Sequence, residues 1–317
     1  MKQINENRFS ATSPIVVTAG ATYLDIDAYA CSVALAELLR LRGKNAIAYS
    51  NAPYNYSVCD FLVTKGQIAT VLPDDCDENT FKYMIVDVSD PDYLEKNVPL
   101  DSVVAVYDHH VGFEEYWTSR IGGNSHIEFI GAAATLIFKE WKASGLLDKM
   151  TRSTALLLIA AILDNTLDLT SSNTTPADVE AFKELCKKEN IGKDWCADYF
   201  SNVQKSVEAD LKNALFGDIK SIGNNDILPA RVAQLCVWDA KSILSELPRI
   251  REWFGKEKSW MINMIDIKHR CSYFVCDDEY HQKEIGRVFG VRFESGVAKT
   301  PISYLRKEII KKSYYND

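Results

Sequence analysis

The sequence lacks the features that mark a membrane or secreted protein. No apolar run approaches the roughly 18 residues that a membrane-spanning helix needs. The opening stretch, MKQINENRFS, has neither the apolar core nor the small-residue cleavage site of a signal peptide. The eight cysteines include no C-x-x-C pair, and in a chain of 317 residues this scatter is typical of reduced thiols rather than of a disulfide framework. We therefore expect a cytoplasmic protein with no membrane partner.

Basic residues are also in short supply. The 36 Lys and Arg are outnumbered by 44 Asp and Glu, which gives a formal net charge of −8. Such a field opposes broad contact with a nucleic-acid backbone, so we expect no stable nucleic-acid complex. An anionic substrate would need metal ions or a local basic patch. The segment from residue 291 to the end offers one, with six Lys and Arg against three Asp and Glu.

The order of apolar patterns predicts an α/β protein of two domains. A chain of 317 residues exceeds the usual size of one hydrophobic core. Short β-rich runs alternate with helical patterns, which is typical of βαβ units on a parallel sheet. The expected strands are 14–19, 45–50, 83–88 and 102–107, and the expected helices are 30–43, 131–146, 151–163, 176–190 and 200–217.

Glycine, asparagine and proline cluster in SIGNNDILPA (221–230), which is the best candidate for a linker. The runs beyond it predict a smaller α/β domain. We therefore expect a metal-binding catalytic domain over 1–202, a helical connection and linker over 203–230, and a phosphate-binding domain over 231–317.

Two of the five histidines stand side by side in YDHHVG (107–112), where the apolar run SVVAV ends. A turn favours Asp and Gly but has no need of two imidazoles. Neutral imidazole is a common metal ligand. The pattern thus makes Asp108, His109 and His110 candidates for a metal site.

Other carboxylates also follow apolar runs. Asp25 and Asp27 follow the first strand in LDID, Asp87 ends a strand in MIVDVSDP, and Asp164 ends the apolar stretch LLLIAAIL. In an open α/β sheet ligands bind beyond the carboxyl ends of the strands, so these groups would converge. Carboxylates that lie together repel one another unless a cation separates them. Carboxylate with imidazole and without thiolate favours Mn²⁺, Mg²⁺, Co²⁺ or a non-structural Zn²⁺ site.

Each carboxylate also has a simpler interpretation. Asp27 is as well placed to cap the next helix as to bind a metal. Asp87 is a reasonable turn residue, and Asp164 is a reasonable helix-capping residue. The metal site is favoured by the occurrence of all these residues in one chain order.

This order of motifs resembles the DHH phosphoesterase superfamily. The match is closest to the branch of manganese-dependent inorganic pyrophosphatases, exopolyphosphatases and Prune-like proteins. The resemblance rests on D-x-D, a strand-end Asp, D-H-H and an apolar run ending in Asp. It extends to GAAATLIFKEW (131–141), LDNTLDLTSSNTTPADVEA (163–181) and the tail GVAKTPISYLRKEIIKK (296–312). It covers nearly the whole chain and implies a DHH domain followed by a DHH-associated domain of the second type.

The resemblance implies a role for each matching residue. The metal ligands would be Asp25, Asp27, Asp87, His109 and Asp164, with about two ions bound. The catalytic and substrate-binding residues would be His110, Asp108, Arg306 and Lys307. Of these, His110 would lie near substrate and metal, and Asp108 would orient an imidazole. Arg306 and Lys307 would bind phosphate, whereas Lys311 and Lys312 are better explained as a solvated helix face.

The chain departs from the family pattern at its first and last motifs. Pyrophosphatases of this family open with G-H-x-x-P-D-x-D, and here GATYLDID (20–27) has Ala21 for the histidine and Leu24 for the proline. Exopolyphosphatases and Prune-like members also lack that histidine. Ala28 replaces a frequent Ser, and Leu305 stands where a Ser would precede the Arg.

The resemblance implies a metal-dependent hydrolase of phosphoanhydride bonds, of exopolyphosphatase or pyrophosphatase type. It would use Mn²⁺, Mg²⁺ or Co²⁺ and act on polyphosphate or a small phosphate-containing substrate. Two alternatives remain open. One is a catalytically weakened member of the family that binds or regulates, as the loss of the histidine at Ala21 favours. The other is a nucleotide phosphodiesterase, for which Tyr23 and Tyr29 could stack a base.

Overall fold

The computed structural model describes residues 14–63, 66–72, 81–223, 225–255 and 259–314. The chain forms two compact units, Met1–Cys196 and Ala197–Asp317. Each unit has its own β-sheet and its own hydrophobic core. Two cores agree with the size of the chain, since single cores rarely grow beyond about 250–300 residues.

The first unit is built on a parallel sheet of five strands in the order β2-β1-β3-β4-β5. The strands are β1 (Ile15–Thr18), β2 (Ala46–Ala48), β3 (Lys82–Val86), β4 (Val103–Asp108) and β5 (Ser125–Ile127). The side chains of β1 and β4 are buried along the whole of each strand, as is usual for a parallel sheet that has both faces covered. The predicted parallel α/β domain is confirmed.

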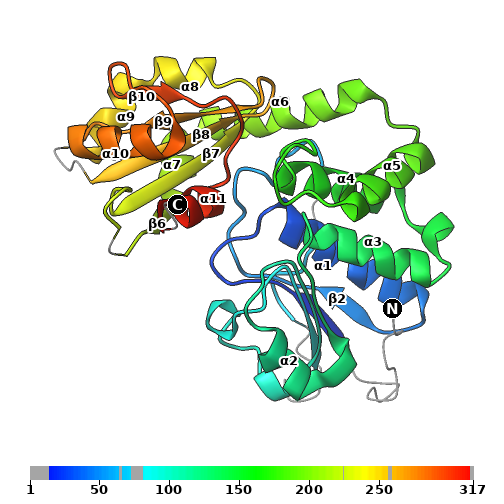
Figure 1. Ribbon diagram of the computed structural model, residues 1–317. Coiled ribbons are helices and arrows are strands. Elements are labelled where there is room, and N and C mark those ends of the chain that lie inside the picture. Colours follow the sequence, from blue (N-terminus) through cyan, green and yellow to red (C-terminus); the bar gives the residue numbers. More distant parts are fainter. Residues whose placement is uncertain (1–13, 64–65, 73–80, 224, 256–258, 315–317) are drawn as a thin grey trace. The chain divides into compact units, whose positions relative to one another are not determined.

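Helices cover both faces of this sheet (Figure 1). The helices of the unit are α1 (Ile26–Leu41), α2 (Glu114–Ile121), α3 (Ala133–Ala143), α4 (Arg152–Asn165) and α5 (Pro176–Glu189). Short 3₁₀ turns occur at η3 (Pro91–Tyr93), η4 (Leu100–Ser102), η5 (Gly122–Asn124) and η6 (Leu147–Lys149). Trp117 of α2 is fully buried in the core on one face, together with Tyr83 and Ile85 of β3. On the other face, α1 packs against α3 and α4.

The strand order determines where a ligand can bind. The chain leaves β1 toward β2 on one side, whereas β3 pairs with the other side of β1. The order of strands therefore reverses between β1 and β3. In open α/β sheets the crevice at this reversal, beyond the carboxyl ends of the strands, is the usual ligand site.

The second unit has a mixed sheet in the order β10-β9-β8-β7-β6. Only β7 and β8 are parallel, and the other pairs are antiparallel. Its strands are β6 (Ile219–Ser221), β7 (Arg231–Val237), β8 (Trp260–Asp266), β9 (Cys271–Val275) and β10 (Val297–Lys299). Its helices are α7 (Leu211–Gly217), α8 (Lys241–Ser245), α9 (Leu247–Phe254), α10 (Glu279–Phe289) and α11 (Arg306–Tyr314). The smaller C-terminal α/β domain is thus confirmed.

The expected helix 200–217 is wrong as a single element. The chain instead forms α6 (Lys193–Ala209) and α7, which are separated at Asp210. Asp210 leaves the helical conformation, with φ −143° and ψ 64°, and its side chain accepts from the N–H of Asn213. Such a carboxylate favours the start of a new helix because it satisfies a backbone N–H that would otherwise have no partner.

The predicted linker at 221–230 is also corrected. β6 precedes this segment and β7 follows it, and the two strands pair with each other in one sheet. The segment is therefore a connection within the second unit. The predicted domain limits at residues 202 and 230 otherwise stay predictions. In the described part of the chain, no helix is long and apolar enough to cross a membrane.

Candidate metal centre

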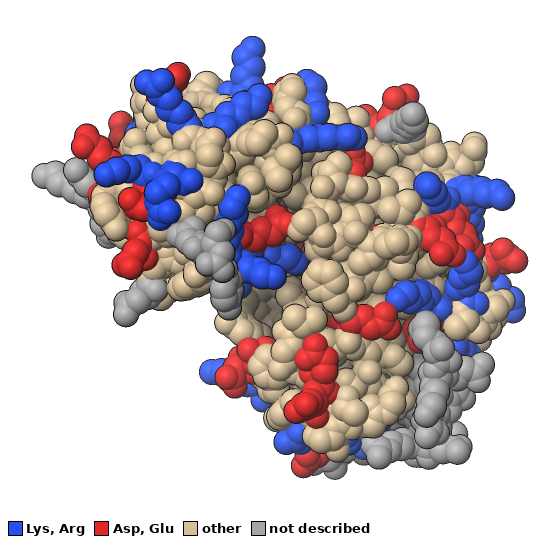
Figure 2. All heavy atoms as spheres, in the orientation of Figure 1, with Lys and Arg blue, Asp and Glu red and all other residues tan. Residues whose placement is uncertain are grey.

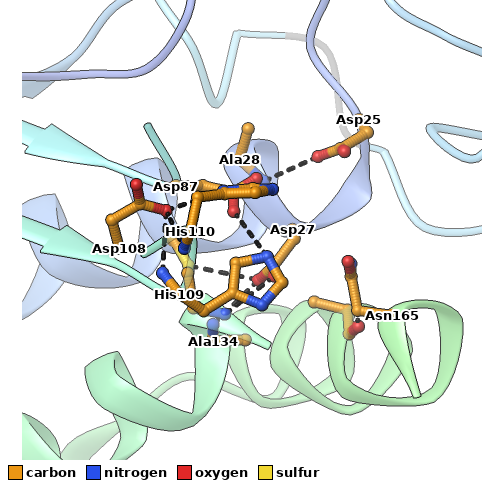
Figure 3. A network of polar contacts seen from close by, with 12 residues as sticks. Asp25, Asp27, Ala28, Asp87, Asp108, His109, His110, Ala134 and Asn165 are labelled. Atoms are coloured by element: carbon orange, nitrogen blue, oxygen red, sulfur yellow. Dashed lines mark hydrogen bonds and ion pairs between the residues drawn. The ribbon is translucent and has the colours of Figure 1, made fainter. Parts of the chain in front are cut away.

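Side chains that follow three neighbouring strands meet at the carboxyl edge of the first sheet (Figure 3). Asp25 and Asp27 come from the start of α1, which follows β1, whereas Asp87 follows β3. His109 and His110 follow β4 directly. These residues meet at the reversal of strand order, where the sequence pattern predicts a site.

Asp25 and Asp27 are fixed by backbone N–H groups at two helix starts. Asp25 is the N-cap of α1 and accepts from the N–H of Ala28 at 3.0 Å. Asp27 is fully buried and accepts from the N–H groups of Ala133 and Ala134, both at 2.8 Å, in the first turn of α3. The N-terminus of a helix favours negative charge, so α3 helps to keep the Asp27 carboxylate ionised.

Asp87 occupies an unusual backbone conformation. Its φ is 57°, in the left-handed region that non-glycine residues seldom adopt, and its N–H donates to the carbonyl of Tyr107 at 2.8 Å. The side chain is 6% exposed. Its Oδ1 forms no hydrogen bond within the described residues, and Nε2 of His109 lies 3.4 Å away. A strained residue with an unpaired buried oxygen is typical of a functional site.

The tautomer of His109 can be assigned from its neighbours. Nδ1 lies 3.2 Å from the carbonyl oxygen of Ile130, which can only accept, so Nδ1 carries the proton. Nε2 then presents a lone pair toward the Oδ1 of Asp87. Two acceptors that face each other in a buried site repel unless a cation lies between them. The Asp87–His109 pair therefore has the chemistry of a metal-ligand pair.

Asp108 holds the histidine turn in shape. It is fully buried, and its Oδ1 accepts from the N–H groups of His109 and His110 and from Nδ1 of His110 at 2.8 Å. Asp108 thus occupies Nδ1 of His110 and leaves its Nε2 available, on a side chain that is 59% exposed. Burial raises the pKa of Asp108, but hydrogen bonding and the nearby charge of His110 outweigh it, so that the pKa is lowered.

The pKa values of the inner carboxylates reflect their crowding. Burial raises the pKa of Asp27 well above its usual value, and the charge of Asp87 adds to the effect. Burial, followed by the charge of Asp25, likewise raises the pKa of Asp87. Without a cation these groups therefore resist joint ionisation. Ligand atoms of Asp87, His109 and His110 lie within 4.8 Å of one another, and this donor set fits a divalent cation.

The end of α4 presents two neighbouring polar side chains. Figure 3 includes Asn165 with the group around His109. Asp164, the predicted ligand, is half-buried and interacts electrostatically with the thiol of Cys59. The structure thus gives Asp164 a neighbour outside the group, and its assignment as a ligand stays a prediction.

The predicted phosphate-binding pair begins α11 in the second unit. The guanidinium of Arg306 is 11% exposed, pairs with the carboxylate of Asp218 at 2.5 Å and donates to the carbonyl of Val232. Lys307 is exposed. On the face that Figure 2 shows, Lys and Arg side chains of the second unit are interspersed with Asp and Glu. Phosphate binding by Arg306 would compete with its bond to Asp218.

A second His–Asp group lies at the carboxyl ends of β7 and β8, formed by Asp239, Asp266 and His269. Asp239 already has a cation, since Lys268 lies 3.0 Å from it. Asp266 accepts from the backbone N–H groups of Ala240 and His269, as a turn residue does. In both groups the ligand atoms lie close enough together to hold a metal ion. The carboxylates of the second group already have Lys268 and backbone N–H groups as partners, whereas Oδ1 of Asp87 in the first group has no hydrogen bond within the described residues.

The two departures in the first motif have structural counterparts. Ala21 is exposed, and its N–H donates to the carbonyl of Tyr93 at 2.8 Å. Leu24 is buried and forms a β-bridge with Tyr54. The methyl group of Ala21 offers no ligand atom. The histidine of the family pattern would offer one, so a metal site that included this position would lack one protein donor.

Sequence reasoning missed the groups that hold these ligands in place. The carbonyl of Ile130 orients His109, and a backbone acceptor leaves no signature in the sequence. The buried carboxylate of Asp178 accepts from Gly131 and Thr135, beside that carbonyl. Asp178 ends the motif T-T-P-x-D (174–178) within the segment 163–181, but nothing in the spacing of that motif indicates what the aspartate contacts.

Neither a protein-family model nor a curated protein matches this sequence. Among solved structures, the chain is similar to a Methanococcus jannaschii protein assigned to the family II inorganic pyrophosphatases. The two share 17% identity with a TM-score of 0.63, over 95% of this chain and 100% of the other. An exopolyphosphatase-related protein of Bacteroides fragilis shares 13% identity with a TM-score of 0.52, over 95% of this chain and 90% of the other.

At these identities the similarity concerns the fold alone. The chain has the two-domain fold of a family II pyrophosphatase, with a five-stranded parallel sheet followed by a mixed sheet. The expected fold of two α/β domains is thereby confirmed.

Proposed function

We propose that this protein is a divalent-metal-dependent hydrolase of phosphoanhydride bonds, of exopolyphosphatase or pyrophosphatase type. The observation that carries the proposal is the buried pair of acceptors, Oδ1 of Asp87 and Nε2 of His109, 3.4 Å apart. A fold shared with phosphoanhydride hydrolases adds support.

Asp25, Asp27, Asp87 and His109 would hold the metal, whereas Asp164, the further ligand that the sequence motif predicts, has the Cys59 thiol as a neighbour and is not included in this set. Bound Mn²⁺, Mg²⁺ or Co²⁺, expected as two ions, would supply Lewis-acid chemistry and acidify a water molecule. The chain's own contribution is to orient these ligands. α3 holds Asp27, and the Ile130 carbonyl keeps the proton of His109 on Nδ1.

His110 is the residue best suited to contact substrate. Its Nδ1 is fixed on Asp108, while its side chain is 59% exposed. Fixing one nitrogen orients the other, so that the imidazole can donate to a phosphate oxygen or exchange a proton with it. The basic side chains of Arg306 and Lys307 are the proposed phosphate-binding pair. For Arg306 this role requires exchange with Asp218.

A second candidate function is a catalytically weakened binding protein, and the specific observation behind it is Ala21. Its methyl side chain cannot ligate a metal. In that case the carboxylate group would still bind a cation or phosphate, but turnover would be slow or absent.

The test is phosphate release from pyrophosphate, tripolyphosphate and longer polyphosphate, with Mn²⁺, Mg²⁺ or EDTA. We expect metal-dependent release that favours chains over pyrophosphate. Asp87→Asn should lower the rate at least about 100-fold, because it replaces a carboxylate oxygen that the proposal makes a metal ligand by a neutral amide. Asp101→Asn is the matched control, because that carboxylate is 98% exposed.

The outcomes separate the candidates. No release from any substrate by folded, metal-loaded protein would favour the binding function. Cleavage of a short oligonucleotide, assayed alongside, with no phosphate release from the three polyphosphate substrates would favour the phosphodiesterase. A near-normal rate for Asp87→Asn would contradict the assignment of the site.

A further inference from the structure

Asp178, in the first turn of α5, is a fully buried carboxylate that joins three segments. Its Oδ2 accepts from the N–H of Gly131 at 3.0 Å and from the N–H and Oγ1 of Thr175, both at 2.7 Å. Its Oδ1 accepts from the Oγ1 of Thr135 at 2.6 Å. Four donors on one buried carboxylate compensate for its loss of water.

The segment that carries Gly131 packs directly on this carboxylate. A Cβ at Gly131 would lie 2.7 Å from the Oδ2 of Asp178 and 2.6 Å from the Cγ2 of Thr166. Both distances are shorter than any real contact of a Cβ, so only glycine allows the close approach. Asp178 therefore fixes the position of Gly131 by a hydrogen bond and by close steric contact.

This segment holds two of the proposed metal ligands. Ile130, next to Gly131, orients His109 through its carbonyl. Ala133 and Ala134 donate their N–H groups to Asp27. Thr135, the next residue, is itself bonded to Asp178. The N–H groups that hold Asp27 thus lie between the two points at which Asp178 holds the chain, and the carbonyl that orients His109 belongs to the same peptide bond as the N–H of Gly131.

We propose that Asp178 is a positioning residue for the metal centre. It acts through the 130–135 segment, where it fixes the carbonyl that sets the tautomer of His109 and the N–H groups that hold Asp27. Outer partners that orient metal ligands typically contribute about 10–100-fold to metal affinity. The proposal deepens the function given above and rests on it for the identity of the ligands.

A purely structural role would be different. Asp178 also completes the N-terminal cap of α5 through Thr175, and a lost cap would lower stability without changing the ligands. Thr135 and Thr175 each donate one hydroxyl to the same carboxylate, at 2.6 and 2.7 Å. Thr135→Val therefore removes the hydrogen bond from α3 to this carboxylate, and Thr175→Val removes the bond from the start of α5.

The first measurement is the Mn²⁺ affinity of the full-length metal-free protein and of Asp178→Asn, Thr135→Val and Thr175→Val. We expect Asp178→Asn to weaken binding about 10–100-fold and Thr135→Val at least about threefold. Thr175→Val should stay within about twofold of wild type. Equal effects of the two threonine variants, or an Asp178→Asn protein that binds like wild type, would overturn the proposal.

The second measurement needs no metal. The ¹⁵N shifts of the His109 imidazole report which nitrogen carries the proton. We expect the Nδ1–H tautomer in wild type and in Thr175→Val, and a larger share of Nε2–H in Thr135→Val and Asp178→Asn. An unchanged tautomer in both of the latter would contradict the positioning role.

The two measurements separate the possible failures. If wild type binds no Mn²⁺, the proposed function fails, while the tautomer still decides the role of Asp178. If Asp178→Asn does not fold, Thr135→Val carries the test, since it removes a single bond and keeps the shape of the side chain.

Discussion

Two facing acceptors, one on Asp87 and one on His109, are the strongest single indication of chemistry in this chain. Because Nδ1 of His109 donates to Ile130, Nε2 carries a lone pair, so a proton or a metal ion must lie between the two acceptors. An unsatisfied buried group costs about 1–3 kcal/mol, and a charged one costs more. A divalent cation between the two would remove that cost, and it would also relieve the repulsion among Asp25, Asp27 and Asp87.

The end of α4 gives a prediction about which side chain serves the site. Asn165 is labelled in the view of the group in Figure 3, and its amide donates to the carbonyl of Ala161 at 3.5 Å, whereas Asp164 has Cys59 as an electrostatic neighbour. We expect Asn165→Asp to strengthen Mn²⁺ binding several-fold, because a carboxylate replaces a neutral amide near the cation. Asp164→Asn should change the affinity less than about twofold.

Isothermal titration of both variants measures the difference. The reverse ranking, with a large loss in Asp164→Asn and no gain in Asn165→Asp, would make Asp164 the ligand, as the sequence motif alone predicts.

The sequence indicated which residues meet at this edge but not what holds them. Asp27, Asp87 and His109 follow apolar runs, and the carboxyl ends of parallel strands must meet at one edge. The support of His109 comes from a backbone carbonyl and that of Asp27 from backbone N–H groups. Every residue has those groups, so no residue type marks them. Arg306 matched a phosphate-binding motif, but its bond to Asp218 depends on a contact 88 residues away in sequence.

At the scale of elements, β5 carries a half-buried imidazole whose buried Nε2 has no hydrogen bond within the described residues. His126 pairs in register with Tyr107 of β4, and the two rings stack with centroids 4.6 Å apart. Nε2 of His126 has no partner in the described residues. Burial lowers the pKa of His126, although the nearby charge of Glu128 opposes the shift.

This lowered pKa predicts a loss of stability in mild acid. The folded-state pKa lies below the unfolded value of about 6.5, so the stabilisation is present above that pH and is lost as the pH falls through the folded value. His126→Phe keeps a stacking ring but cannot take a proton. We expect the fall in unfolding free energy from pH 7 to pH 5 to be smaller in the variant than in wild type.

Urea unfolding at both pH values, for wild type and His126→Phe, gives this difference. The other titrating groups are common to both proteins and cancel in the comparison. An identical pH dependence in the two proteins would contradict the assignment to His126.

The elements themselves were predictable where they are long and periodic. β1, β3 and β4 are apolar runs with clear ends, and α1 and α5 carry helical patterns. β5 was missed because its three residues, Ser-His-Ile, are too few to show a period. α2 was missed because only Trp117 and Ile121 of its eight residues are buried. Such short elements form because the neighbouring strand and core stabilise them.

At the scale of the whole molecule, acidic and histidine side chains follow the carboxyl ends of parallel strands in each unit. In the second unit Lys268 and backbone N–H groups already satisfy Asp239 and Asp266. In the first unit Oδ1 of Asp87 has no hydrogen-bond partner among the described residues. The same strand-end pattern thus yields a turn in one sheet and the proposed metal site in the other, and the difference lies in whether the ligand atoms already have hydrogen-bond partners.

The most direct test of this account is a Mn²⁺ titration of the metal-free protein, of Asp87→Asn and of Asp239→Asn. We predict that wild type and Asp239→Asn bind with the same affinity, and that Asp87→Asn binds at least about 100-fold more weakly. Binding by Asp87→Asn at the wild-type affinity would contradict a metal centre at the carboxyl edge of the first sheet. A loss of binding confined to Asp239→Asn would assign the metal to the second unit instead.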